Sequence, residues 1–187
     1  MKSSPAKQRI IETASHLFYQ KGYNLTGINE IIEKAEIAKA TLYNHFKSKE
    51  DICLAYLKYK DSTLQTELRA AIEKTPKGKK RLLVFFDFLK VFFEDKDFNG
   101  CWCLNTISEL PKENEKIRAT IQQQKHGLLK LIGRIAEENL PHKLEQEQAA
   151  ITKQIYLLYE SALSESYLHQ EAWPIESARK LCAAIIE

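Results

Sequence analysis

The spacing of apolar residues divides the chain into a series of amphipathic helices. Apolar side chains recur three and four positions apart, which is the helical period, and glycine, proline or polar turns separate the periodic segments. The pattern predicts helices over residues 7–21, 28–35, 39–45, 48–74, 79–95, 101–110, 113–139, 147–170 and 175–186. We therefore expect an all-α fold.

Two of these helices, residues 28–35 and 39–45, are short and are separated only by residues 36–38. A turn of this length is typical of a DNA-binding helix-turn-helix rather than of an ordinary helical hairpin. We expect the Thr26 hydroxyl to cap the first helix, and Leu42 and Phe46, four residues apart, to anchor the second. The second helix then presents its polar side chains to solvent.

Those polar side chains have the chemistry of a recognition helix. Lysine can reach a guanine edge or a phosphate, threonine offers a hydroxyl and a methyl group, and asparagine can pair with adenine. We expect Ser48 to cap the next helix, with Glu50 and Asp51 in its first turn, so that Lys49 lies beside free N–H groups suited to a phosphate oxygen. We expect base contacts from Lys39, Ala40, Thr41 and Asn44, and phosphate contacts from Thr26, Tyr43, His45 and Lys49.

The segment of residues 9–52 resembles the DNA-binding region of TetR-family transcriptional regulators. The match lies in Arg9, Ile11, Ala14, Leu17, Phe18, Gly22, Tyr23, Thr26, Ile28, Ile31, Ala35, Ile37, Thr41, Leu42, Tyr43, Phe46, Lys49 and Glu50. Two features depart from the family pattern: Glu36 stands where a turn glycine is usual, and residues 38–40 lack the usual serine and glycine. The missing serine removes a helix cap, and Glu36 would be strained if its backbone is left-handed.

The resemblance implies a domain organisation as well as a function. We expect an N-terminal three-helix helix-turn-helix DNA-binding domain over residues 1–50. The long helix of residues 48–74 would join it to a helical-bundle domain for effector binding and dimerisation over residues 51–187, and would transmit an inducer signal. The expected function is repression at a pseudo-palindromic operator, relieved by a ligand, although the residues do not exclude activation.

Residues 79–95 form the most aromatic segment of the chain and predict a helix that is buried on two sides. One interpretation is a plain core helix, and the other is that one face lines a ligand cavity. We expect a small, mostly apolar effector in a cavity lined by some of Tyr56, Tyr59, Phe85, Phe88, Phe92, Trp102, Tyr156 and Tyr159.

The four cysteines are expected to be free thiols, with Cys53 and Cys182 in the core. Cys101 lies near a predicted helix N-terminus, where it could sense oxidants or electrophiles; the alternative is inert packing. Cys101 and Cys103 are two residues apart and therefore lie on different helix faces, and no further ligand follows at metal spacing. We expect no metal site and no cofactor.

The last two helices, which we expect to be separated by Trp173 and Pro174, carry more apolar surface than one core requires. Residues 147–170 show a stripe that includes Ile151 and Ile155 and a second, flatter stripe that includes Leu157. Both stripes could be buried within one chain. Pairing across a two-fold axis would also bury the surplus, and we expect a homodimer through these two helices.

Composition and charge agree with a DNA-binding arm on a neutral body. The 187 residues are 44% hydrophobic and 28% charged with a net charge of +3; residues 1–60 hold ten basic and six acidic residues, hence +4, which leaves −1 for the remainder. We expect no membrane span, no signal peptide and a cytoplasmic location. We found no catalytic constellation, so an enzyme is not expected, and the competing class is a helical small-molecule carrier or interaction protein that does not bind DNA.

Overall fold

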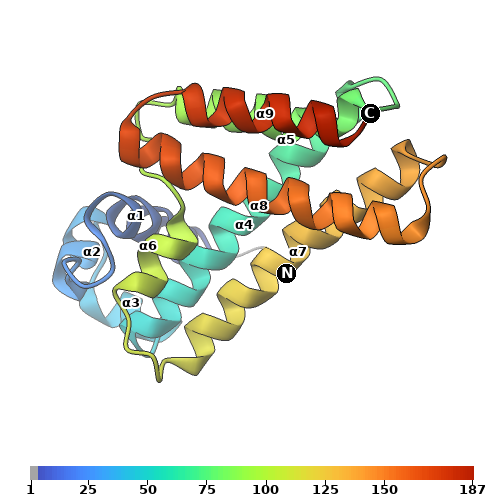
Figure 1. Cartoon of the computed structure of the whole chain (residues 1–187). Helices are drawn as coiled ribbons and strands as arrows, with labels where there is room; N and C mark the ends of the chain where they lie inside the picture. The colour runs from blue at the N-terminus through green and yellow to red at the C-terminus, as the bar shows by residue number, and fades with distance from the viewer. Residues whose placement is uncertain (1–3) are drawn as a thin grey trace. The chain divides into compact units, whose positions relative to one another are not determined.

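A computed structural model describes residues 4–187, and over this range the chain is α-helical with no strands. The helices run in the order α1 (Pro5–Lys21), α2 (Ile28–Lys34), α3 (Lys39–His45), α4 (Lys49–Lys74), α5 (Lys80–Phe93), α6 (Trp102–Ser108), α7 (Glu115–Asn139), α8 (Glu145–His169) and α9 (Trp173–Ile185) (Figure 1). The predicted all-α fold is confirmed. None of the described helices is long and apolar enough to cross a membrane.

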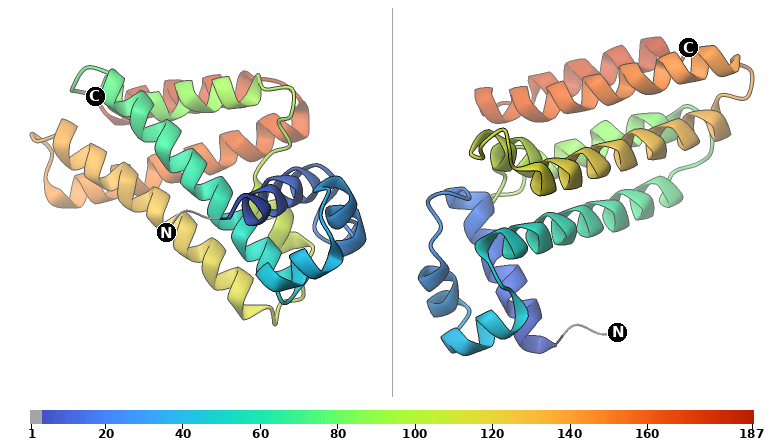
Figure 2. Two further views of the ribbon diagram at one scale, coloured as in Figure 1. Left: turned by 180° about the vertical axis from the view of Figure 1, so that it is seen from behind. Right: turned by 90° about the horizontal axis from the view of Figure 1, so that it is seen from below.

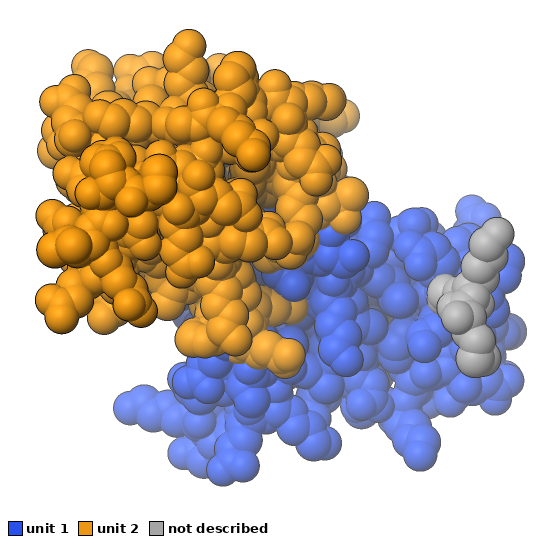
Figure 3. Space-filling model, turned by 90° about the vertical axis from the view of Figure 1, so that its right-hand side faces the viewer, with its two compact units in different colours: residues 1–64, 102–122 blue, residues 65–101, 123–187 orange. Residues whose placement is uncertain are grey.

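The helices form two compact units, which are coloured separately in Figure 3. The first contains the described residues up to Leu64 together with Trp102–Gln122, and the second contains Gln65–Cys101 and Gln123–Glu187. The long helix α4 and the helix α7 each contribute residues to both units. Each unit is described separately below.

The first unit is built on the apolar face of α1. Ile10, Ala14, Leu17 and Phe18 are buried along this face, and α1 contacts α2, α3 and α6. Ser4 caps the helix by accepting the Lys7 N–H at 3.2 Å, and proline at the first helical position needs no N–H partner. For this reason α1 begins two residues before the predicted start at residue 7.

The turn between α2 and α3 carries backbone strain. Glu36 has a φ of 50°, in the left-handed region that disfavours residues with a Cβ. The strain anticipated from the missing turn glycine is therefore present. The missing serine also has its predicted effect, since Ala38 stands at the N-cap of α3 and no side chain caps that helix.

The second unit packs α5, α8 and α9 against one another (Figures 1 and 2). Phe85, Phe86 and Leu89 on α5 are fully buried, and the Phe86 ring lies 6.4 Å from that of Tyr159 on α8. Burial raises the pKa of Cys182 on α9 to about 12, as it does for Cys53 in the first unit. The predicted core placement of both thiols is confirmed.

The predicted separation of the last two helices at Trp173 and Pro174 is wrong. Both residues belong to the first turn of α9, and Gln170 ends α8 with a left-handed φ of 54°. Proline is tolerated in the first turn of a helix because the N–H groups there lack intrahelical acceptors. A proline after a helical segment therefore marks a helix start here.

Replacement of Glu36 by glycine tests the strain in the turn. We expect Glu36→Gly to raise the free energy of unfolding by about 0.5–1 kcal/mol, because relief of the left-handed strain exceeds the added entropy of the unfolded chain. Urea denaturation followed by circular dichroism measures this change. The matched control is Glu33→Gly, at an exposed helical position of α2, which should lower the same free energy by about 0.5–1 kcal/mol. If both variants were less stable than the native protein, Glu36 would not be strained in the folded state.

Candidate nucleic-acid interface

The orientation of α3 is fixed by two apolar anchors. Leu42 and Phe46 are only 1% and 5% exposed, as predicted for the residues that hold the recognition helix. The opposite face is open: Lys39, Ala40, Tyr43 and Asn44 are exposed, and Thr41 and His45 are half-buried. The structure thus brings six of the predicted DNA-contacting residues onto one short helix, with the polar ones accessible.

The N-terminal end of α1 lies beside this helix. The His45 Nε2 and the Ser4 Oγ are 3.2 Å apart, and the Lys7 Nζ lies 5.7 Å from the centre of the Phe46 ring. Lys7 is therefore a further basic side chain at the edge of the interface. Sequence reasoning missed it, because no local pattern relates the start of α1 to the end of α3.

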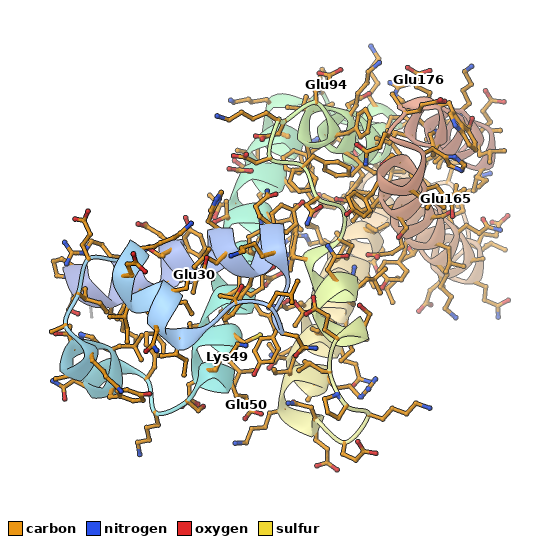
Figure 4. All side chains as sticks on the ribbon, turned by 90° about the vertical axis from the view of Figure 1, so that its left-hand side faces the viewer. Glu30, Lys49, Glu50, Glu94, Glu165 and Glu176 are labelled. Atoms are coloured by element: carbon orange, nitrogen blue, oxygen red, sulfur yellow. The ribbon has the colours of Figure 1, made fainter. Side chains whose placement is uncertain are left out.

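Lys49 begins α4 immediately after the recognition helix (Figure 4). Ser48 caps α4 by accepting the Asp51 N–H at 3.0 Å, as predicted. The Lys49 ammonium lies 4.4 Å above the ring of Tyr23 and 3.5 Å from the backbone oxygen of Asn24. This partial burial lowers the pKa of Lys49. Its side chain is thus held in place by the loop between α1 and α2.

Thr26 does not have the predicted role of a helix cap. It is 0% exposed and its hydroxyl donates to the backbone oxygen of Gly22 at 2.8 Å, while Gly27 occupies the N-cap of α2. The hydroxyl therefore braces the loop that precedes α2. A phosphate contact from the Thr26 side chain would require it to leave this position.

The residues predicted to line an effector cavity fall into two groups. Tyr56, Tyr59 and Trp102 belong to the first unit, and Phe85, Phe88, Phe92, Tyr156 and Tyr159 belong to the second. Tyr56 and Phe85 are fully buried and Tyr159 nearly so. Burial raises the pKa of both Tyr56 and Tyr159 above the usual range. These phenols are therefore buried, neutral hydroxyl groups.

A polar cluster lies within the second unit. The Lys125 ammonium on α7 is 3.3 Å from the Sγ of the buried Cys101 and 2.5 Å from the Glu160 Oε2 on α8. The other carboxylate oxygen of Glu160 is buried and accepts no hydrogen bond from the described residues. Sequence reasoning identified Cys101 alone, because its neighbours come from two distant helices. Among the described residues, no group of three or more His, Cys, Asp or Glu side chains could hold a metal ion.

The N-terminal segment matches a known family. Residues 10–56, which include α2, α3 and the start of α4, match the model for bacterial regulatory proteins of the tetR family. The match covers the recognition helix and its two anchors, Leu42 and Phe46.

Individual relatives agree with this match. The chain is 34% identical over 86 residues to the transcriptional activator FasR of Mycolicibacterium smegmatis, an alignment that covers 44% of this chain and only 39% of the length of FasR. It is 22% identical over 177 residues to the transcriptional repressor NemR of Escherichia coli, covering 92% of this chain and 89% of NemR. The structure of SCO4454, a TetR-family regulator from Streptomyces coelicolor, superposes with a TM-score of 0.88 at 22% identity, covering 98% of this chain and 89% of SCO4454.

Proposed function

Since the chain belongs to the TetR family of bacterial regulatory proteins, we propose that it represses transcription by binding a pseudo-palindromic operator as a homodimer. The family is one of transcriptional regulators, not of enzymes. The observation that carries the proposal is the open polar face of α3, held by Leu42 and Phe46 and flanked by Lys49. A helix anchored in this way can enter a major groove with its side chains directed at base edges.

We expect two types of contact with DNA, to bases and to phosphates. Lys39, Ala40, Thr41 and Asn44 would read bases, whereas Tyr43, His45 and Lys49 would bind phosphates. Lys7 adds a candidate phosphate contact from α1. The functional DNA-binding domain would then comprise residues 1–50, and residues 51–187 would serve effector binding and dimerisation. Because its target is chromosomal DNA, we expect the protein in the bacterial cytoplasm.

The effector would be a small, mostly apolar molecule that releases the repressor. The buried aromatic residues of α5 and α8 support an apolar ligand, and the neutral hydroxyl of Tyr159 could orient it. Ligand binding would favour a state in which the two recognition helices no longer match successive grooves. NemR is named a repressor and FasR an activator. That this chain represses transcription, rather than activating it, is therefore part of what we propose.

Titration of the protein into labelled duplex DNA at two or more salt concentrations tests the function. The duplex is selected by the native protein from random-sequence DNA. With about eight phosphates neutralised by a dimer, the logarithm of the affinity should fall with the logarithm of the salt concentration at a slope of about −7. Absence of binding at low salt would refute the proposal and favour a carrier or interaction protein that does not bind DNA.

Three alanine variants separate the two types of contact. Lys49→Ala should weaken binding to all sequences alike and reduce the magnitude of the slope by about 2 for a dimer. Lys39→Ala and Asn44→Ala should instead change which sequence is preferred, because removal of a base-reading side chain costs about 1–3 kcal/mol of binding free energy. Lys77→Ala, an exposed charge in the loop before α5, is the matched control and should bind like the native protein. A uniform decrease in affinity in all three variants would contradict the assignment of base readers.

Dimerisation would bury an exposed stripe on the last two helices. Leu157 on α8 is 64% exposed and Leu181 on α9 is 55% exposed, while Ile151 and Ile155 face the core. Ala150, Gln154 and Ser161 continue the exposed stripe along α8 and are small or polar enough for close helix packing. This flat surface supports a two-fold contact with a second copy.

Sedimentation velocity of the double variant Leu157→Glu and Leu181→Glu tests this surface. We expect the native protein to sediment as a dimer and the variant as a monomer, because two carboxylates per protomer would be buried without partners. Val91→Glu is the matched control, since Val91 on α5 is 67% exposed and lies outside the stripe. A dimeric double variant would place the interface elsewhere.

A second candidate function is redox sensing at Cys101. An ammonium group 3.3 Å from the sulfur stabilises a thiolate. The thiolate would attack one oxygen of a peroxide; the O–O bond breaks, the sulfur becomes a sulfenic acid, and the leaving hydroxide takes a proton from Lys125 to form water. Oxidation removes the negative charge of the sulfur, which leaves the Glu160 carboxylate as the negative group beside Lys125.

Labelling with a sulfenic-acid probe after peroxide treatment, read by mass spectrometry, tests this candidate. Cys101 should be labelled at least about tenfold faster than Cys53, whose burial holds its thiol protonated. Lys125→Met should abolish the difference, and peroxide should lower the DNA affinity of the native protein but not of Cys101→Ser. Equal labelling of Cys101 and Cys53 would leave Cys101 as inert packing.

A further inference from the structure

The segment of residues 109–116, which runs from the end of α6 into the first turn of α7, contacts the DNA-binding elements at two places. We propose that Glu109 in this segment is a positioning residue for DNA binding, which holds the loop of residues 22–27 and, through it, α2 and Lys49. This inference rests on the proposed DNA-binding function, although Glu109 lies outside the helix-turn-helix. The contacts that carry it are all within the first unit.

Glu109 accepts two hydrogen bonds from one loop residue, Asn24, with two different groups. Its Oε2 accepts the backbone N–H of Asn24 at 2.7 Å, and its backbone oxygen accepts the Asn24 Nδ2 at 2.8 Å. A hydrogen bond from a backbone N–H to a carboxylate is stronger than one between neutral groups. The two bonds together fix both the main chain and the side chain of Asn24 relative to the end of α6.

Gly22, in the same loop, leaves room for the Glu109 carboxylate. Its φ is 92°, a conformation that favours glycine, and a Cβ added at Gly22 would lie 2.9 Å from the Glu109 Oε2 and closer still to the Glu109 Oε1. The carboxylate therefore occupies the space that a side chain at position 22 would need. Position 22 therefore suits glycine for two reasons, its positive φ and the nearby carboxylate.

The loop that Glu109 holds determines where several DNA-binding groups lie. The Gly22 backbone oxygen accepts the Thr26 hydroxyl just before α2, and the Asn24 backbone oxygen and the Tyr23 ring hold the Lys49 ammonium. A shift of the loop would move the start of α2, which packs against α3, and would release Lys49. Glu109 thus acts on the interface through the loop, without touching DNA itself.

The other end of the segment contacts Glu50 at the start of α4. The Glu50 carboxylate accepts the Asn114 Nδ2 at 3.0 Å and pairs with the Lys116 ammonium at 3.3 Å. Asn114 also accepts the Ile117 N–H at 3.1 Å and so caps α7. Lys49 and Glu50 are adjacent at the start of α4 (Figure 4). One end of the segment thus bonds the loop that holds Lys49, and the other end bonds Glu50 beside it.

The charge of Glu109 distinguishes positioning from direct contact. A carboxylate near Lys49 opposes phosphate binding by its charge, so its effect on affinity is favourable only if the hydrogen bond to Asn24 outweighs that repulsion. Glutamine keeps an oxygen acceptor and removes the charge, whereas alanine removes both. The two substitutions therefore have opposite expected effects.

The experiment compares Glu109→Ala, Glu109→Gln and Glu113→Ala in the full chain, with a duplex that the native protein selects from random-sequence DNA. We expect Glu109→Ala to raise the Kd about tenfold, because only a fraction of the protein then holds the competent loop conformation. Its salt dependence should be unchanged, because the same phosphates are neutralised. Glu109→Gln should bind at least as tightly as the native protein. Glu113→Ala removes the same charge from an exposed position of the same segment and should change nothing.

Amide hydrogen exchange gives a readout that does not depend on DNA. The Asn24 amide should be protected in the native protein and in Glu109→Gln, and should exchange about tenfold faster in Glu109→Ala. If Glu109→Ala unfolds, Asn24→Ala replaces it: this variant removes only the side-chain bond and should raise the Kd by a smaller factor.

The outcomes separate this inference from the function on which it rests. A native protein that binds no duplex would refute DNA binding, while the Asn24 exchange rates would still decide whether Glu109 holds the loop. A Kd for Glu109→Ala equal to that of the native protein, or an equal rise in the Kd of Glu113→Ala, would overturn the positioning role. A changed salt slope in Glu109→Ala would also overturn it, because it would mean that the number of neutralised phosphates had changed.

Discussion

The packing of Leu42 and Phe46 against the helices before α3 is the interaction on which the candidate nucleic-acid interface depends. A helix of seven residues is too short to persist alone in water, where about 12–15 residues are marginal. Its N-terminus has no side-chain cap, and the turn before it is strained at Glu36. The apolar anchors must therefore stabilise both the helical conformation and its direction, which leaves the polar face free for recognition.

The sequence predicted the parts of the structure that rest on local patterns. The short turn at residues 36–38 and the four-residue spacing of Leu42 and Phe46 were sufficient to place the helix-turn-helix. The exact helix cap was harder: Thr26 was predicted to cap α2, but Gly27 occupies the N-cap and the Thr26 hydroxyl donates to the Gly22 backbone oxygen instead.

Features that join distant segments could not be predicted in this way. Lys125 on α7 contacts both Cys101 and Glu160 on α8, and Lys7 reaches the end of α3 from the start of α1. Neither arrangement has a sequence period or a motif, because each depends on how helices pack. Trp173 and Pro174 show a related ambiguity, since proline is compatible with both the end of one helix and the first turn of the next.

The fit between Gly22 and the Glu109 carboxylate also has an evolutionary consequence. A side chain at position 22 would need the space that the Glu109 carboxylate occupies and would be strained by the positive φ, so position 22 is restricted while the loop keeps this conformation. In a diverging lineage position 109 could change while glycine stays at position 22, whereas a larger residue at position 22 would require both a new loop conformation and a movement of the Glu109 side chain. The recognition helix could then acquire new base preferences while this pair, which only supports it, stays the same.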